Sequence, residues 1–139
     1  MKGRALGPEK VRVYWEKSQR FAASAHAAAR AGHWDPAVSA AVHAAINGVD
    51  ALSIARLGRR SSSDSHADAV DLLDAMESDP AATRAEIAKH FRALLAVKHL
   101  AEYEARLCDA NDGNRAVRHM DRALDQVEKL LGEARSKRA

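Results

Sequence analysis

Apolar residues recur at intervals of three and four along almost the whole chain, which is the spacing of one face of an α-helix. The pattern is clearest between residues 38 and 52 and between residues 117 and 131. No stretch alternates apolar and polar positions with enrichment in β-branched residues, so the pattern indicates no β-strand. The sequence therefore predicts an all-α protein.

Breaks between the periodic segments give the expected helix ends in the first half of the chain. Pro8 is well placed for the first turn of a helix that ends at Gly32. Asp35 and Pro36 have the pattern of an N-cap followed by proline at the first helical position. The second helix is expected to start there and to end at Gly58.

In the second half a polar loop leads into a shorter helix, which Pro80 ends. Thr83 to Glu86 have the form of a capping box, which predicts the start of a long helix that continues to Leu107. Residues 111–114, Asn-Asp-Gly-Asn, predict a turn before the last helix. Short connections make sequential helices antiparallel, so we expect an antiparallel up-and-down bundle of four long helices and one short helix.

Length and composition agree with this fold. A chain of 139 residues suits one domain. We assign that domain to residues 8–134, with a flexible basic N-terminus at 1–7 and a basic C-terminal tail at 135–139. Hydrophobic residues make up 47% of the chain and aromatic residues only 4%, because alanine dominates the apolar fraction. Alanine is the best helix former and lets helices approach closely.

Charge and cysteine content bound the function more weakly. The 22 Lys and Arg against 19 Asp and Glu permit RNA or another anionic partner without requiring one. The single cysteine, Cys108, excludes an intrachain disulfide, and we expect it to be a small helical core residue. We see no zinc cluster and no apolar run of about 18 residues. These features predict a cytoplasmic protein that uses no metal or cofactor.

Several segments together resemble bacterial HEPN proteins. They are Trp34-Asp35-Pro36, His43-Ala44-Ala45-Ile46 and Asp50-Ala51-Leu52 on the second helix, the Gly58-Arg59 turn, Asp64 and His66 before the short helix, and Lys98 to Glu102-Tyr103. The resemblance covers roughly residues 8–133 and depends on loose helical patterns.

The resemblance implies a helical bundle that commonly forms a homodimer. Many HEPN proteins are metal-independent ribonucleases, often toxins paired with a nucleotidyltransferase-like antitoxin. Others lack the active site and serve as binding or regulatory modules. Active members carry an arginine followed, after four to six residues, by a histidine at the start of the final long helix, and the dimer brings these residues together.

Arg115 and His119 are the nearest match at the expected place, although only three residues separate them. At positions i and i+4 they share a helix face. A histidine there can move the proton of a 2′-hydroxyl or a leaving group, and an arginine can hold the phosphate. The alternative is a solvated, highly charged helix surface. Arg92 and His99 have a permitted spacing, but they lie in the middle of the long helix before the final one.

A polar line of His43, Asn47 and Asp50 interrupts the apolar second helix. Unpaired polar groups are costly to bury, so these side chains should find partners or face a cavity or solvent. A satisfied internal network or an exposed stripe is one interpretation. A small polar ligand pocket between helices is the other.

The loop after the second helix is basic and rich in hydroxyl groups. Arg56, Arg59 and Arg60 lie beside a serine triplet and Asp64, which is a composition that can hold a phosphate. The loop lacks the glycine spacing of a P-loop. Asp64 and His66 are two metal-binding residue types, but a pair without a third ligand does not make a metal site.

Three hypotheses about function follow. The leading one is a HEPN-like homodimeric binding or regulatory module associated with RNA, a nucleotide or a partner protein. The second is a metal-independent endoribonuclease that uses Arg115 and His119, as the toxin of a toxin–antitoxin pair. The third is a purely structural helical protein.

Overall fold

The computed structural model describes residues 4–62 and 67–138, with side chains described up to residue 132. Its elements are β1 (Arg4–Ala5), α1 (Lys10–Arg30), α2 (Trp34–Leu57), β2 (Arg59–Arg60), α3 (Ala67–Ala75), α4 (Ala81–Tyr103) and α5 (Ala110–Arg138). The expected all-α fold, with four long helices and one short helix, is confirmed.

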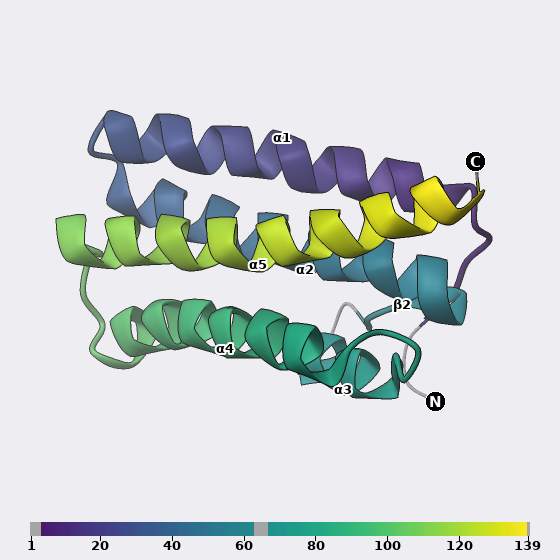
Figure 1. Cartoon of the computed structure of the whole chain (residues 1–139). Helices are drawn as coiled ribbons and strands as arrows, with labels where there is room; N and C mark the ends of the chain where they lie inside the picture. Colours follow the sequence, from purple (N-terminus) through teal and green to yellow (C-terminus); the bar gives the residue numbers. More distant parts are fainter. Residues whose placement is uncertain (1–3, 63–66, 139) are drawn as a thin grey trace.

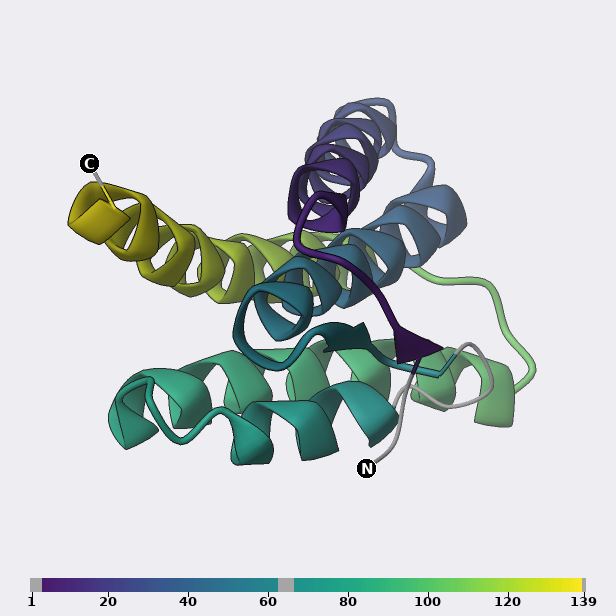
Figure 2. The ribbon, with the colours of Figure 1, turned by 90° about the vertical axis from the view of Figure 1, so that its right-hand side faces the viewer.

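The four long helices run alternately up and down in the order α1, α2, α4, α5 (Figure 1). Helix α2 packs against both α1 and α5, and α5 packs in turn against α4. The short α3 lies beside α4, and the C-terminal half of α5 swings away from α1 (Figure 2). Helix α1 therefore lies at the edge of the bundle, whereas α2 and α5 form its centre.

Helix α2 contributes the largest share of the core. It has 13 buried residues, against two on α1. Many of those on α2 are alanines, which let the neighbouring helices approach closely. At Gly48 even a Cβ atom would collide with the Leu124 side chain of α5 and crowd the Ser18 hydroxyl of α1. Close three-helix contact at this point therefore requires glycine.

Helix α2 is also long and apolar enough to cross a membrane, with a mean hydropathy of 1.3 in its most apolar window. In the bundle 72% of that window is buried. The core helix of a water-soluble bundle has the same composition, so this feature alone is weak evidence for a membrane span.

The expected end of α2 is confirmed and its expected start is wrong. Gly58 caps the helix in the left-handed region, at φ +69°. The helix begins at Trp34, one residue before the predicted N-cap. Instead of capping α2, the Asp35 carboxylate accepts the backbone N–H of Cys108, at 3.1 and 3.3 Å. A tertiary contact thus uses the group that the local pattern assigned to a cap.

Both predicted boundaries of α4 also need correction. The helix begins at Ala81, so Thr83 to Glu86 already lie inside it and form no capping box at its start. It ends at Tyr103 rather than Leu107, because Ala105 turns the chain with φ +50°.

Helix α5 begins earlier than the sequence indicates. Residues 111–114, expected as a turn, lie in its first turns. A reciprocal cap explains this start, because the Asp109 carboxylate accepts the N–H of Asp112 and the Asp112 carboxylate accepts the N–H of Asp109, both at 2.9 Å. Asp109 and Asp112 therefore form the capping box that was expected elsewhere.

A two-stranded ribbon lies outside the helical pattern. β1 pairs antiparallel with β2, with Arg4 opposite Arg60 and Ala5 opposite Arg59. The N–H of Leu6 continues the pairing to the Gly58 carbonyl at 2.9 Å. Strands of two residues are too short to show alternation, so the expectation of no strand is wrong at this one place among the described residues.

Candidate functional site

Two histidines meet where α4 packs on α5. His90 occupies a position on the apolar stripe of α4, beside Ile87 and Phe91, and is only 6% exposed. His119 extends from α5, and the Nδ1 atoms of the two rings lie 3.0 Å apart. A hydrogen bond at this distance requires one ring to donate and the other to accept.

A carboxylate lies on the other side of His90. Glu86, one turn earlier on α4, places its Oε2 atom 3.4 Å from Nε2 of His90. The Glu86 side chain is about half exposed, whereas that of His90 is 7% exposed. Glu86, His90 and His119 therefore form a row from the solvent-exposed edge of α4 through the helix interface to α5.

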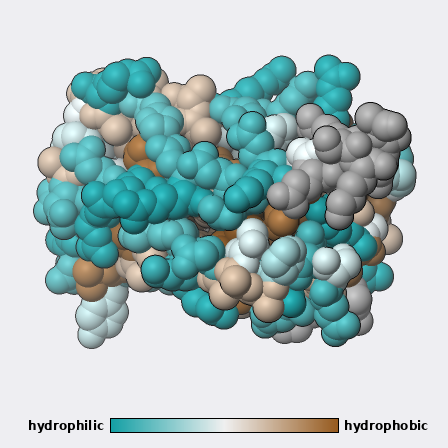
Figure 3. Space-filling model, in the orientation of Figure 1, coloured by the Kyte–Doolittle hydropathy of each residue, from teal (hydrophilic) through white to brown (hydrophobic). Residues whose placement is uncertain are grey.

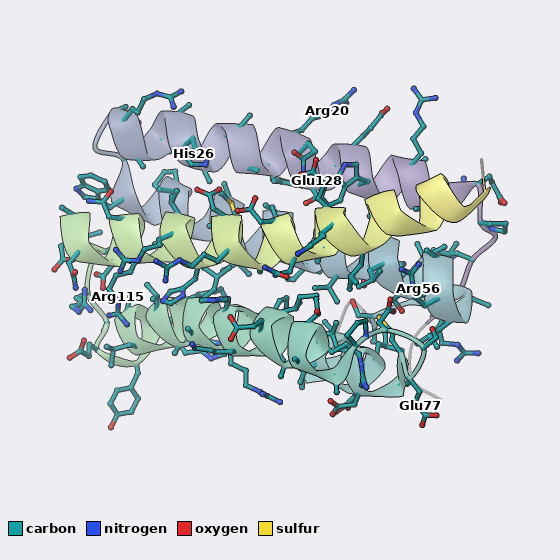
Figure 4. The ribbon with its side chains drawn as sticks, viewed as in Figure 1. Arg20, His26, Arg56, Glu77, Arg115 and Glu128 are labelled. Atoms are coloured by element: carbon teal, nitrogen blue, oxygen red, sulfur yellow. The ribbon has the colours of Figure 1, made fainter. Side chains whose placement is uncertain are left out.

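His119 is surrounded by positive charge. Burial lowers the pKa of its imidazole, and His90 and three arginines of α5, Arg118, Arg115 and Arg122, lower it further. Because the pKa lies below the ordinary histidine value of 6.5, the ring is neutral at pH 7. Arg115 lies on the side of α5 that faces α4 (Figure 4).

A shallow cavity of about 340 Å³ opens beside the two histidines, and we call it the α4–α5 pocket. It is lined by Glu86, Lys89, His90, Arg122, Asp125 and Gln126. The molecular surface over α5 in this region is mainly hydrophilic (Figure 3). His119 contacts the pocket residue His90 but does not itself line the pocket, whose lining brings an imidazole, cations and carboxylates together at a polar surface.

This arrangement suits proton transfer and anion binding. A neutral imidazole next to fixed cations can accept a proton while guanidinium groups hold a phosphate. Of the two residues that the sequence placed together here, His119 contacts His90, whereas Arg115 acts on the His119 ring through its charge, and neither lines the pocket.

The second Arg/His pair lies elsewhere on α4. Arg92 and His99 are both exposed. The α4 residue that meets the α5 histidine is His90 instead.

The polar line of α2 is accounted for residue by residue. Buried Asp50 accepts the N–H and the O–H of Ser61, at 2.8 and 2.7 Å, although burial still raises its pKa. Asn47 donates to the His43 carbonyl of its own helix at 2.8 Å. The exposed His43 ring packs against Phe21, with centroids 5.2 Å apart. These contacts favour the structural interpretation of the line over a shared ligand pocket.

Two basic residues at the end of α2 and directly after it make structural contacts within the bundle. Arg56 binds both carboxylate oxygens of Asp79, at 2.9 and 3.0 Å, and donates to the Leu130 carbonyl at 3.0 Å (Figure 4). Arg59 lies in β2, where its carbonyl accepts the Ser53 hydroxyl. Asp64 and His66 lie outside the described residues.

Cys108 lies in the loop between α4 and α5, so its expected helical position is wrong. Burial raises the pKa of its thiol to about 11, and the Asp35 carboxylate acts in the same direction. The thiol is therefore protonated near neutral pH and unsuited to nucleophilic attack. Among the side chains that the structure describes, in residues 4–62 and 67–132, no group of three His, Cys, Asp or Glu residues is arranged to hold a metal ion.

Sequence reasoning missed His90, Glu86, Lys89 and Arg122. One signal was available for the first two, because His90 interrupts the apolar stripe of α4 and Glu86 precedes it by four residues. A glutamate at that spacing faces the same side of the helix as the histidine. The pairing of His90 with His119 spans 29 residues and depends on how α4 packs against α5.

Comparison of the chain with protein-family models, with curated proteins and with solved structures gives no significant match. The function is therefore argued from the site itself.

Proposed function

We propose that this chain is a HEPN-like module that binds RNA along the part of α5 that carries Arg115, His119 and Arg122, next to the α4–α5 pocket. The observation that carries the proposal is the neutral His119 beside the α5 arginines Arg115, Arg118 and Arg122. Guanidinium groups hold phosphates, and a neutral imidazole can accept a hydrogen bond from a 2′-hydroxyl. RNA carries the 2′-hydroxyl and the 3′-phosphate on adjacent carbons of the ribose, whereas DNA lacks the hydroxyl.

The HEPN resemblance adds two further proposals. The module works as a cytoplasmic homodimer, and a nucleotidyltransferase-like protein is a candidate partner. Partly exposed apolar residues on the peripheral helix α1, Val13 at 41% and Phe21 at 37%, are available for contact with another chain. A nucleotide remains the smaller alternative ligand, since it carries the same phosphate chemistry.

A second function, metal-independent RNA cleavage, is favoured by one specific observation. His119 touches a buried histidine that is itself next to a carboxylate. A base whose partner is oriented by a third group is the arrangement that activates hydroxyl nucleophiles in enzymes. In RNA the 2′-hydroxyl would lose its proton to His119 and attack the adjacent phosphorus. The bond from phosphorus to the 5′-oxygen of the next nucleotide would break, leaving a 2′,3′-cyclic phosphate and a 5′-oxygen that takes up a proton.

Binding to a mixed RNA pool, measured with partner-free protein, tests the first proposal. We expect Arg115→Ala to weaken binding about tenfold or more, because a lost charge-assisted hydrogen bond costs about 1.5–3 kcal/mol. Arg92→Ala removes the same charge from the exposed face of α4 and serves as the matched control. Equal effects of the two substitutions would contradict a site at α5.

Cleavage of the same pool distinguishes the two functions. Cleavage that is lost in both Arg115→Ala and His119→Ala, but kept in Arg92→Ala and His99→Ala, would establish an enzyme and its site together. RNA that is bound and left intact by the wild type would establish binding without catalysis. Absence of binding by folded protein would overturn both proposals.

A further inference from the structure

We infer that Glu86 and His90 hold His119 in the tautomer whose Nε2 atom is unprotonated, and that a proton accepted there is relayed to His90. The inference deepens the proposed function, and its consequence for RNA rests on that function. His90 is then a positioning residue, since it acts on the ligand only through His119.

The charge and the contacts along the row favour one arrangement of protons when both rings are neutral. Glu86 is an ionised acceptor, so the Nε2 atom of His90 facing it at 3.4 Å is favoured in its protonated form. A neutral His90 then has a lone pair on Nδ1. The Nδ1 atom of His119, 3.0 Å away, must donate to that lone pair. The remaining nitrogen of His119, Nε2, is left with a lone pair.

Burial makes this arrangement specific. His90 is 6% exposed, so water is a poor substitute for either of its partners. Reversing the row would direct the unprotonated Nε2 of His90 at a carboxylate, which places two acceptors against each other. The Nδ1–H tautomer of His119 avoids this repulsion.

The same row provides a path for a proton. When Nε2 of His119 accepts a proton from a hydroxyl, that O–H bond breaks and an N–H bond forms. The Nδ1 proton of His119 can then pass across the 3.0 Å contact to Nδ1 of His90. His119 returns to neutrality with hydrogen on Nε2, and the positive charge rests on His90.

The charges on both helices favour this direction of transfer. His119 faces Arg115, Arg118 and Arg122 of α5, all of which oppose a positive charge on its ring. On the His90 side, the Oε2 atom of the Glu86 carboxylate lies 3.4 Å from Nε2. Lys89 of α4 and Asp125 of α5 also line the pocket with opposite signs.

Long-range ¹⁵N–¹H NMR spectra of the histidine rings of the free protein, recorded near pH 7.5, test the inference without RNA. We expect His119 to carry its proton on Nδ1, and exposed His99 in the same spectrum is the internal reference for a ring without this row. A wild-type His119 with its proton on Nε2 overturns the inference.

Three variants separate positioning from packing. Glu86→Gln changes a half-exposed side chain, so it preserves the fold, and its amide can donate as well as accept. We expect it to give His119 a mixture of both tautomers. His90→Asn keeps an acceptor near Nδ1 and should retain the Nδ1–H form, whereas His90→Phe should lose it. An unchanged His119 spectrum in Glu86→Gln and His90→Phe overturns the inference.

The outcomes are independent of the RNA experiments. An Nδ1–H tautomer in a protein that binds no RNA supports the inference and removes the proposed function. RNA binding by a protein whose His119 has its proton on Nε2 supports the proposed function and overturns the inference. If cleavage is found, Glu86→Gln should shift the pH profile of the rate, which a purely packing role would leave in place.

Discussion

At the scale of single residues, two glycines of α5 occupy opposite environments. A Cβ atom on Gly113 would lie 2.5 Å from the Trp34 ring, which is rigid and packed over the start of the helix. At Gly132 the same atom would meet nothing within 4 Å. Alanine gains about 1 kcal/mol over glycine inside a helix, so the surroundings decide the sign of each substitution.

We predict that Gly113→Ala destabilises the protein by roughly 1–3 kcal/mol, the usual cost of overpacking. Gly132→Ala, the same change in the same helix, should stabilise it by up to about 1 kcal/mol. Urea unfolding followed by circular dichroism gives both values. Equal shifts of the two midpoints would show that Trp34 does not constrain Gly113.

The sequence revealed site residues that are joined by a local spacing on one helix and missed those whose partners lie on another element. Arg115 and His119 were found because a local spacing joins them on one helix. His90 was missed because its partner lies on another helix, and only the packing of α4 on α5 brings the two rings together. Asp50 was noticed as an unusual polar residue, but its role depended on Ser61, across the end of α2.

At the scale of elements, the sequence predicted helix interiors well and several boundaries poorly. Gly58 marked a true end, because a left-handed residue stops a helix whatever surrounds it. Asp35 lies in the first turn of α2 and Asp109 lies directly before α5, yet only Asp109 caps its helix. The Asp35 carboxylate instead accepts a hydrogen bond from a loop residue 73 positions later in the chain. A local sequence pattern cannot predict such a long-range partner.

The start of α5 gives a direct test of the reciprocal cap. We predict that Asp109→Ala lowers the free energy of unfolding by about 0.5–2 kcal/mol, the usual cost of losing an N-cap side chain. Asp109→Asn keeps a capping oxygen and should recover most of the loss. The measurement is urea unfolding at neutral pH. If alanine and asparagine behave alike, the cap does not stabilise this helix.

At the scale of the whole molecule, a few polar contacts connect helices that the apolar core alone would leave less well fixed. Arg56 of α2 joins Asp79, before α4, to a carbonyl of α5. His26 of α1 binds Asp121 of α5 at 2.9 Å (Figure 4). Such contacts use residue types that also bind ligands, which is why a basic loop in the sequence can be part of the scaffold.

The pH dependence of stability is the property of the whole molecule that follows from these charges. The pKa of His119 in the folded state is lowered, chiefly by burial, and that of His43 is lowered for the same first cause. Below the unfolded value of about 6.5, the unfolded chain therefore binds more protons at these rings than the folded protein does. Their contribution is fully present above pH 6.5 and is lost as the pH falls toward the folded pKa values.

We predict that the urea midpoint of the wild type decreases between pH 7.5 and pH 5.5, and that His119→Gln makes this decrease less steep. His99→Gln, on the exposed face of α4, is the matched control and should leave the slope near that of the wild type.

Asp50→Asn tests the opposite sign, because burial raises the pKa of that carboxyl, and its contribution to the free energy of unfolding weakens as the pH rises above about 3.8. That variant should lose less stability than the wild type as the pH rises through this acidic window. If the slope for His119→Gln equals that of the wild type, the His119 ring has the same pKa in the folded protein as in the unfolded chain. The lowered pKa on which the proposed RNA site depends would then be contradicted.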